Sequence, residues 1–301
     1  MTYSIVARDP RTGELGVAVQ TRWFNVGSVV PWAEPGVGAV ATQSFAEISY
    51  GPKGIELMGQ GVPAADALDR LRAEDPAEAG RQVAMVDSNG TVAVFTGSGC
   101  VAEAGSASGD GVTTQANMME RATVWGAMLA AFESAEGDLA DRLLAALRAA
   151  EDEGGDMRGR QSAALLVVPA EGDRWSRRFD LRVEDHRDPV GELARVLQLA
   201  RAFEHLERGL DLAGQMSFPA ALEEMDSATA LAPDDDEIAF FRAMMLAPNG
   251  RPLEAREELD RIRLIEPRWG PYLWRSAKAG LAPDDPDFLS ALAPLDPEER
   301  P

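Results

Sequence analysis

The sequence predicts an α+β domain in which two β-sheets pack between layers of helices, followed by an all-α region. Short β-like runs with Gly and Asp turns alternate with helical stretches over residues 1–190. Several of these runs are apolar without a break, as is typical of strands buried on both faces. Residues 191–301 instead show helical spacing and an internal repeat. The expected domain boundary therefore lies between residues 190 and 191.

Two β-hairpins are predicted in this domain. The first joins Thr2–Ala7 to Gly16–Gln20. The second joins Val83–Val86 to Thr91–Thr96 and contains Asn89-Gly90, a dipeptide favoured in tight hairpin turns. The other predicted strands are Gly27–Val30, Gly36–Ser44, Ala163–Val168 and Arg178–Val183.

Two stretches within this domain carry apolar residues at helical spacing. They are Pro52–Glu74, which begins with a proline, and Arg121–Glu151. Gly137 and Asp138 are expected to break the second stretch into two helices. Helices that pack on the sheets would cover the apolar faces of these strands.

The C-terminal region repeats small residues and prolines at one spacing. Pro233 and Pro267 are 267 − 233 = 34 residues apart, and so are Ala221 and Ala255. This period is typical of tetratricopeptide repeats, but two repeats and a stub are fewer than an independent array needs. We therefore expect the array to pack against the first domain or against a second copy, most simply in a two-fold homodimer, or to bind a protein partner. The apolar residues expected to be left exposed by the short array are Trp269, Tyr272, Leu273 and Trp274.

Composition narrows the function classes. The net charge is −21, with 50 acidic and 29 basic residues, and this argues against nucleic-acid binding, which needs clustered Lys and Arg. Cys100 is the single cysteine, which suits a reducing compartment. No membrane span or secretory signal is recognised, so a cytoplasmic location is expected. No phosphate-binding glycine motif or zinc-ligand spacing occurs, and neither cofactor nor metal is predicted.

Thr2 is the most informative candidate for chemistry. A small residue after Met1 allows aminopeptidase to remove the methionine, and Thr2 would then carry a free α-amine beside its hydroxyl. Such an amine can take the hydroxyl proton and activate the oxygen as a nucleophile. It titrates near pH ~7.7–8.0, which suits a general base. The ordinary alternative is that Thr2 marks only efficient methionine removal.

Polar side chains at strand ends and turns are expected to converge on this nucleophile. Gln115 and Asn117, in the run Thr113–Asn117 that we interpret as a loop, are candidates for an oxyanion hole. Arg22 or Arg158 would hold a substrate carboxylate through a bidentate contact. The alternative for each is a cap, a turn bond or a solvated charge. The remaining candidate substrate-binding residues are Gln43, Ser44, Asp156 and Gln161.

Six segments carry a family resemblance: Thr2–Pro10, Gly13–Val19, Gly36–Gln43, Ser49–Gly54, Gly155–Leu165 and Asp185–Val190. They resemble the bacterial and archaeal family catalogued as domain of unknown function 1028, which is similar to the N-terminal-nucleophile (Ntn) hydrolases. The resemblance spans residues 2–200 and implies a four-layer αββα sandwich and, by analogy, amide hydrolysis with Thr2 as nucleophile. Family members often read Gln-Gly-Asn where this chain has Gln115-Ala116-Asn117.

Two functions from different classes follow from these observations. The first is an Ntn-type amidohydrolase that cleaves the C–N bond of a small metabolite or peptide, with Thr2 as nucleophile. The alternative is a catalytically inactive αββα domain that binds a metabolite, with the helical tail as a protein-docking module.

Overall fold

The structure of the protein is a computed structural model that describes residues 2–280, 282 and 284–294. The chain forms two compact units, one ending at Val196 and the other beginning at Leu197. The first unit is mixed α+β with antiparallel sheets and the second is helical, as the sequence predicts.

Two antiparallel sheets form the centre of the first unit over the described residues. The larger has the strand order β10-β9-β2-β1-β8-β7, and the smaller has the order β3-β4-β5-β6. The strands of the larger sheet are β1 (Thr2–Arg8), β2 (Leu15–Thr21), β7 (Gly105–Gly109), β8 (Val112–Asn117), β9 (Ser162–Val168) and β10 (Phe179–Val183). Those of the smaller sheet are β3 (Pro31–Glu34), β4 (Gly38–Ser44), β5 (Arg81–Asp87) and β6 (Val92–Thr96).

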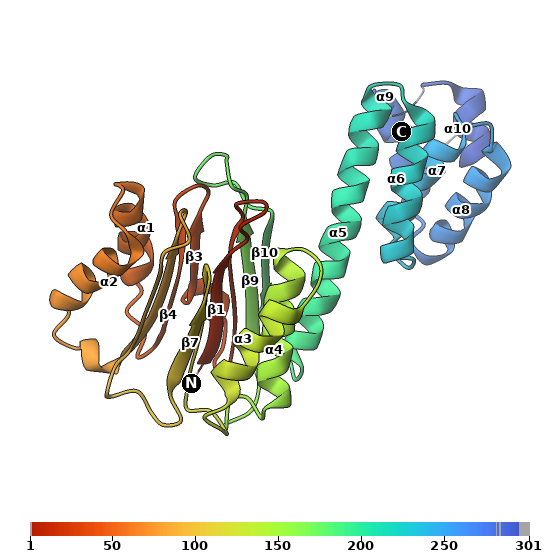
Figure 1. Ribbon diagram of the computed structural model, residues 1–301. Helices are drawn as coiled ribbons and strands as arrows, with labels where there is room; N and C mark the ends of the chain where they lie inside the picture. Colours follow the sequence, from red (N-terminus) through yellow and green to blue (C-terminus); the bar gives the residue numbers. More distant parts are fainter. Residues whose placement is uncertain (1, 281, 283, 295–301) are drawn as a thin grey trace. The chain divides into compact units, whose positions relative to one another are not determined.

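A pair of helices covers the outer face of each sheet, as Figure 1 shows. Helices α1 (Tyr50–Gly59) and α2 (Ala64–Ala73) pack on the smaller sheet. Helices α3 (Val124–Ser134) and α4 (Leu139–Asp152) pack on the larger sheet. The inner faces of the sheets meet through small and β-branched side chains, among them Val6, Val17, Val19, Ala39, Ala41 and Val86.

Burial on both faces explains why the run Ile5–Ala7 of β1 is apolar without a break. Val6 belongs to the cluster between the sheets, whereas the hydroxyl of Tyr3 donates to Glu151 of α4 on the other side. Successive side chains of a strand point to opposite faces, so a strand with a layer on each side shows no alternation of apolar and polar residues.

The break predicted in the second helical stretch is confirmed. Asp138 caps α4: its side chain accepts from the Asp141 amide at 3.1 Å, and the Asp141 carboxylate accepts from the Asp138 amide in return. This reciprocal pair satisfies two of the donors that every helix N-terminus leaves open. A local signal of this kind acts within four residues, which is why the sequence predicts it well.

Two local predictions are wrong. Pro52–Glu74 is not one helix, because Gly61 (φ 84°) reverses the chain and Pro63 then precedes the first turn of α2. The segment Gly27–Val30 is not a strand: a 3₁₀ turn, η1 (Val26–Ser28), follows Asn25 in the left-handed region (φ 55°). The strand of this region is β3, which starts at Pro31.

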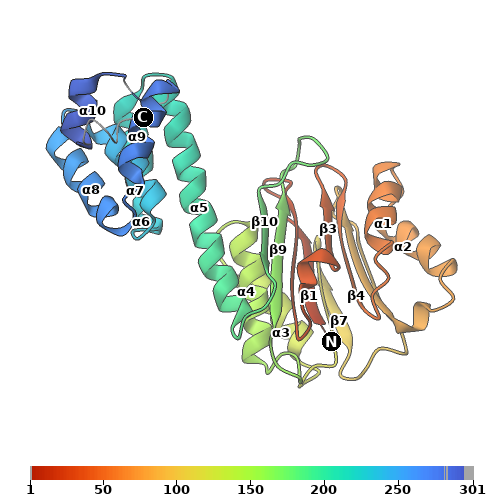
Figure 2. The same ribbon diagram turned by 180° about the vertical axis from the view of Figure 1, so that it is seen from behind.

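The second unit is helical and is seen from behind in Figure 2. Helices α6 and α8 start 252 − 218 = 34 residues apart, and Ala221 and Ala255 occupy matching buried positions in them. No helix in the described part of the chain has the length and apolar character that a bilayer span requires. The helices are α5 (Pro189–Gly214), which crosses the boundary of the units, α6 (Phe218–Leu231), α7 (Asp236–Leu246), α8 (Pro252–Ile265), α9 (Trp269–Lys278) and α10 (Pro286–Leu292).

The expected exposure of the α9 apolar residues is wrong for three of the four. Leu273 and Trp274 are buried, and the Trp274 indole donates to the Ala293 carbonyl at 3.0 Å. Trp269 is half-buried and its ring stacks on Phe240 of α7, with centroids 4.9 Å apart. Ala293, directly after α10, and the ring of Phe240 in α7 contact this face, and Tyr272 alone of the four stays exposed.

Candidate functional site

Thr2 begins β1, a central strand of the larger sheet. Its backbone lies opposite Asn117 of β8, and its hydroxyl donates to the Thr21 hydroxyl at the end of β2 at 3.1 Å. Thr2 is buried although it is the first residue of the strand. The pairing of β1 on both edges therefore fixes the backbone of Thr2.

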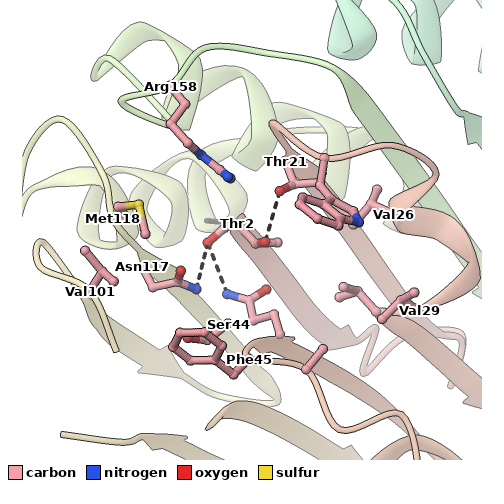
Figure 3. A pocket seen from close by; sticks show the side chains of 14 residues that line it. Thr2, Thr21, Val26, Val29, Ser44, Phe45, Val101, Asn117, Met118 and Arg158 are labelled. Atoms are coloured by element: carbon pink, nitrogen blue, oxygen red, sulfur yellow. Dashed lines mark hydrogen bonds between the residues drawn. The ribbon is translucent and has the colours of Figure 1, made fainter. Parts of the chain in front are cut away.

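A cavity of about 430 Å³ lies beside Thr2 (Figure 3). It brings together five of the predicted site residues, from the ends of β1, β4 and β8 and from the loop after α4: Thr2, Gln43, Ser44, Asn117 and Arg158. Ser44 (φ 70°) and Met118 (φ 61°) have left-handed backbones where β4 and β8 end. Strained backbone of this kind clusters at functional sites.

Buried amides hold the carbonyl of Thr2 in place. Gln43 Nε2 donates to it at 3.2 Å and Asn117 Nδ2 at 3.4 Å (Figure 3). Both amides also donate to Gln82 Oε1, each at 2.8 Å. Gln82 thus fixes the two side chains that contact Thr2. Gln82 is not among the site residues predicted from the sequence, although a glutamine directly before the apolar run of β5 is a signal that could have found it.

Gln115 lies outside the cavity lining. Its Nε2 donates to Ser4 Oγ at 2.5 Å, and Ser4 Oγ donates to Gln43 Oε1 at 2.6 Å, deep between the sheets. The run Thr113–Asn117 is strand β8 and not the loop that we expected. Its polar side chains are buried, so no alternation of apolar and polar residues marks it as a strand in the sequence.

Asp156 also lies outside the cavity lining, and its carboxylate holds two neighbouring segments of backbone. Its carboxylate accepts from the Arg22 amide at 2.9 Å and from the Arg158 amide at 2.9 Å. It also pairs with the Arg158 guanidinium at 3.2 Å, and that guanidinium reaches the cavity. Asp156 therefore positions Arg158 and does not line the cavity itself.

Arg22 and Gln161 line a second depression, of about 550 Å³, together with Arg160, Asp185, His186 and Arg187. The Arg22 guanidinium donates to Gln161 Oε1, and Gln161 Nε2 donates to Asp185 at 3.1 Å. Because Thr21 and Trp23 line the first cavity and Arg22 the second, the two lie on either side of one short segment.

Ionisable groups are scarce around Thr2. Of the residues that line its cavity in the described chain, Arg158 alone has an ionisable side chain. On the opposite face of β1, burial raises the pKa of Glu151, while the hydrogen bond from Tyr3 and the charge of Arg160 act against this shift. Burial also raises the pKa of Tyr3 well above its ordinary value. No group of three His, Cys, Asp or Glu side chains suited to a metal ion occurs in the described residues.

Comparisons with known proteins match the first unit. The model of the family of unknown function DUF1028 matches residues 2–193. The chain is also similar to the crystal structure of protein SPO2555 from Silicibacter pomeroyi, a DUF1028 protein, with 33% identity and a TM-score of 0.61 over 66% of this chain and 88% of that one. No curated protein matches. The chain thus belongs to the DUF1028 family, whose match spans the sheets, their helices and the Thr2 cavity.

Proposed function

We propose that the protein is an amidohydrolase of the Ntn type, in which Thr2 is the nucleophile and its own α-amine is the base. The observation that carries the proposal is the position of Thr2, whose side chain lines the cavity while buried amides hold its carbonyl. Two sheets between helix pairs also suit an αββα sandwich of this class. The proposal requires cleavage of the peptide bond that precedes Thr2.

The proposed reaction has two halves. The α-amine takes the Thr2 hydroxyl proton while Oγ attacks the amide carbon. The protonated amine then donates to the leaving nitrogen, the C–N bond breaks, and an ester joins the acyl group to Thr2. Water attacks this ester with the amine again as base, which releases a carboxylic acid and restores the hydroxyl. The atoms and electrons of both halves balance without an external oxidant, reductant or metal ion.

Asn117 is the best candidate for an oxyanion donor. One of its two amide hydrogens is held by Gln82 at 2.8 Å, and the other makes the longer 3.4 Å contact with the Thr2 carbonyl. The long contact is the weaker one, so this hydrogen is the one available to a developing oxyanion. Gln115 does not reach the cavity and has no direct part in the proposed site.

One observation favours a binding module as the second candidate. Among the described lining residues no side chain can act as a general base, because the Arg158 guanidinium only donates and the others do not ionise near neutral pH. If the α-amine of Thr2 stays blocked, the cavity has no base. The protein would then bind a small molecule without turning it over.

Two substitutions at Thr2 test the proposal. Thr2→Ala keeps a small residue for methionine removal but deletes the attacking oxygen, so turnover of any amide or lactam found in a substrate screen should fall by several orders of magnitude. Thr2→Ser keeps the hydroxyl and should retain part of the activity. An acylating probe should label the wild type at Thr2 by peptide mapping, and equal turnover in the wild type and Thr2→Ala would exclude the mechanism.

A further inference from the structure

The cavity beside Thr2 is mainly apolar. Val26 and Val30 form a buried part of its wall, and Val29 lies next to them. These three come from η1 and the residues after it, while Thr2 and Asn117 contribute from the larger sheet. A ligand whose reactive group lies against Thr2 therefore has valine side chains along another wall.

Most polar groups of the cavity already bond within the protein; the Asn117 hydrogen that makes the long 3.4 Å contact remains for the reacting carbonyl. Gln43 and Asn117 donate to the Thr2 carbonyl and to Gln82, and Arg158 pairs with Asp156. No carboxylate lines the cavity in the part of the chain that the structure describes. A strongly polar ligand would lose its bonds to water here without replacement, whereas an apolar group would gain by leaving water.

The opening of the cavity is apolar as well. Trp23 and Phe45 line it with 68% and 63% of their surface exposed, and Val101 is also exposed. They come from three separate segments: the turn after β2, the turn after β4, and the loop between β6 and β7. Single exposed apolar residues are ordinary, but three that line one cavity indicate a site for an apolar ligand.

We infer that this cavity binds the apolar acyl part of an amide, so that the substrate class is a hydrophobic N-acyl amide. The placement of the carbonyl at Thr2 rests on the proposed function, and the binding of the apolar group does not. The acyl chain lies along Val26, Val29 and Val30 and passes between Trp23 and Phe45 toward solvent. The volume of about 430 Å³ falls within the range of small-molecule pockets.

Binding is measured first, without turnover. Primary amides from acetamide to octanamide are titrated into the Thr2→Ala protein by calorimetry. Each added methylene that enters an apolar site should raise the affinity about fourfold until the cavity is full. Affinity that does not change with chain length, or that is highest for acetamide, overturns the inference.

Matched variants then locate the site. Trp23→Ala and Phe45→Ala should each weaken octanamide about tenfold and leave acetamide unchanged. The controls are Trp175→Ala and Phe24→Ala, at residues that are 72% and 61% exposed and do not line the cavity. Ala46→Trp, which places a ring in the lining, should abolish binding. Equal losses in the controls contradict the assignment.

The results separate this inference from the proposed nucleophile. Length-dependent binding with no turnover of any amide by the wild type would support the apolar site and count against Thr2 as a nucleophile. Turnover that depends on Thr2 but shows no preference for longer acyl groups would support the nucleophile and overturn the substrate class.

Discussion

At the scale of single residues, the chemistry proposed for Thr2 depends on atoms outside its side chain. Its hydroxyl bonds to Thr21 and its carbonyl to two amides, so three contacts fix the residue before any substrate binds. Groups held in place in this way lose little entropy on reaching a transition state. The α-amine is the component that processing must supply.

The first residue-scale prediction concerns that amine. Methionine aminopeptidase acts before small residues, so most molecules should begin Thr-Tyr-Ser. N-terminal sequencing and intact mass of the protein from cells measure this directly, with a Thr2→Leu variant as a control that should keep Met1. A majority of wild-type molecules that read Met-Thr-Tyr would contradict the enzymatic proposal.

Glu151 gives a prediction about pH. Burial raises its pKa, so the folded protein keeps the carboxyl protonated to a higher pH than the unfolded chain does, for which the value is about 4.3. Its contribution to the free energy of unfolding is therefore largest below pH ~4.3 and falls as pH rises through the raised pKa.

Glu151→Gln should remove this fall while keeping an acceptor for the Tyr3 hydroxyl. Urea unfolding of the wild type and the variant from pH 4 to 8 measures the difference between them. Glu136→Gln, at an exposed position, is the control and should follow the wild type at every pH. If the free energy of unfolding of the wild type changed with pH in the same way as that of Glu151→Gln, the raised pKa of Glu151 would be contradicted.

At the scale of elements, the strands around Thr2 are joined by buried amides. Gln82 of β5 accepts from Gln43 and Asn117, and its own amide donates to the Thr96 hydroxyl and the Ala116 carbonyl, each at 2.9 Å. It therefore links the two sheets directly behind the candidate site. Networks of this kind specify one arrangement when every member is satisfied.

Gln82→Leu should therefore cost about 2–4 kcal/mol in the free energy of unfolding, because it leaves buried amide groups without partners. Gln20→Leu is the matched control: Gln20 is equally buried, but neither of its side-chain polar atoms has a partner among the described residues. Its replacement should change stability by less than about 1 kcal/mol or raise it. Denaturant midpoints measure both, and equal losses would contradict the role given to Gln82.

At the scale of the whole molecule, self-association remains a prediction, but the exposed apolar residues that favour it lie on α8 and not on α9. Trp274 and Leu273 are buried, but Leu253 and Leu264 of α8 are exposed. They are 264 − 253 = 11 residues apart, close to three helical turns, and so lie on one face of the helix. A two-fold dimer would cover such a face on both copies.

Light scattering at micromolar concentration should give a dimer mass for the wild type and a larger monomer fraction for Leu264→Lys. Met216→Lys changes an exposed apolar residue outside α8 and is the control, which should stay dimeric. A clean monomer mass for the wild type would contradict the dimer.

The sequence by itself determined the class of the fold and the break at Asp138, and it singled out Thr2 as the candidate nucleophile. Apolar runs, capping residues and turn dipeptides act over a few neighbours and can be read along the chain. The tertiary structure alone decided that β8 is a strand, that Gln82 lies behind Thr2 and that the cavity wall is apolar. These features depend on contacts between distant segments, such as the bond from the Arg22 amide to Asp156 across 134 residues, and polar side chains become strand interior only when another sheet supplies their partners.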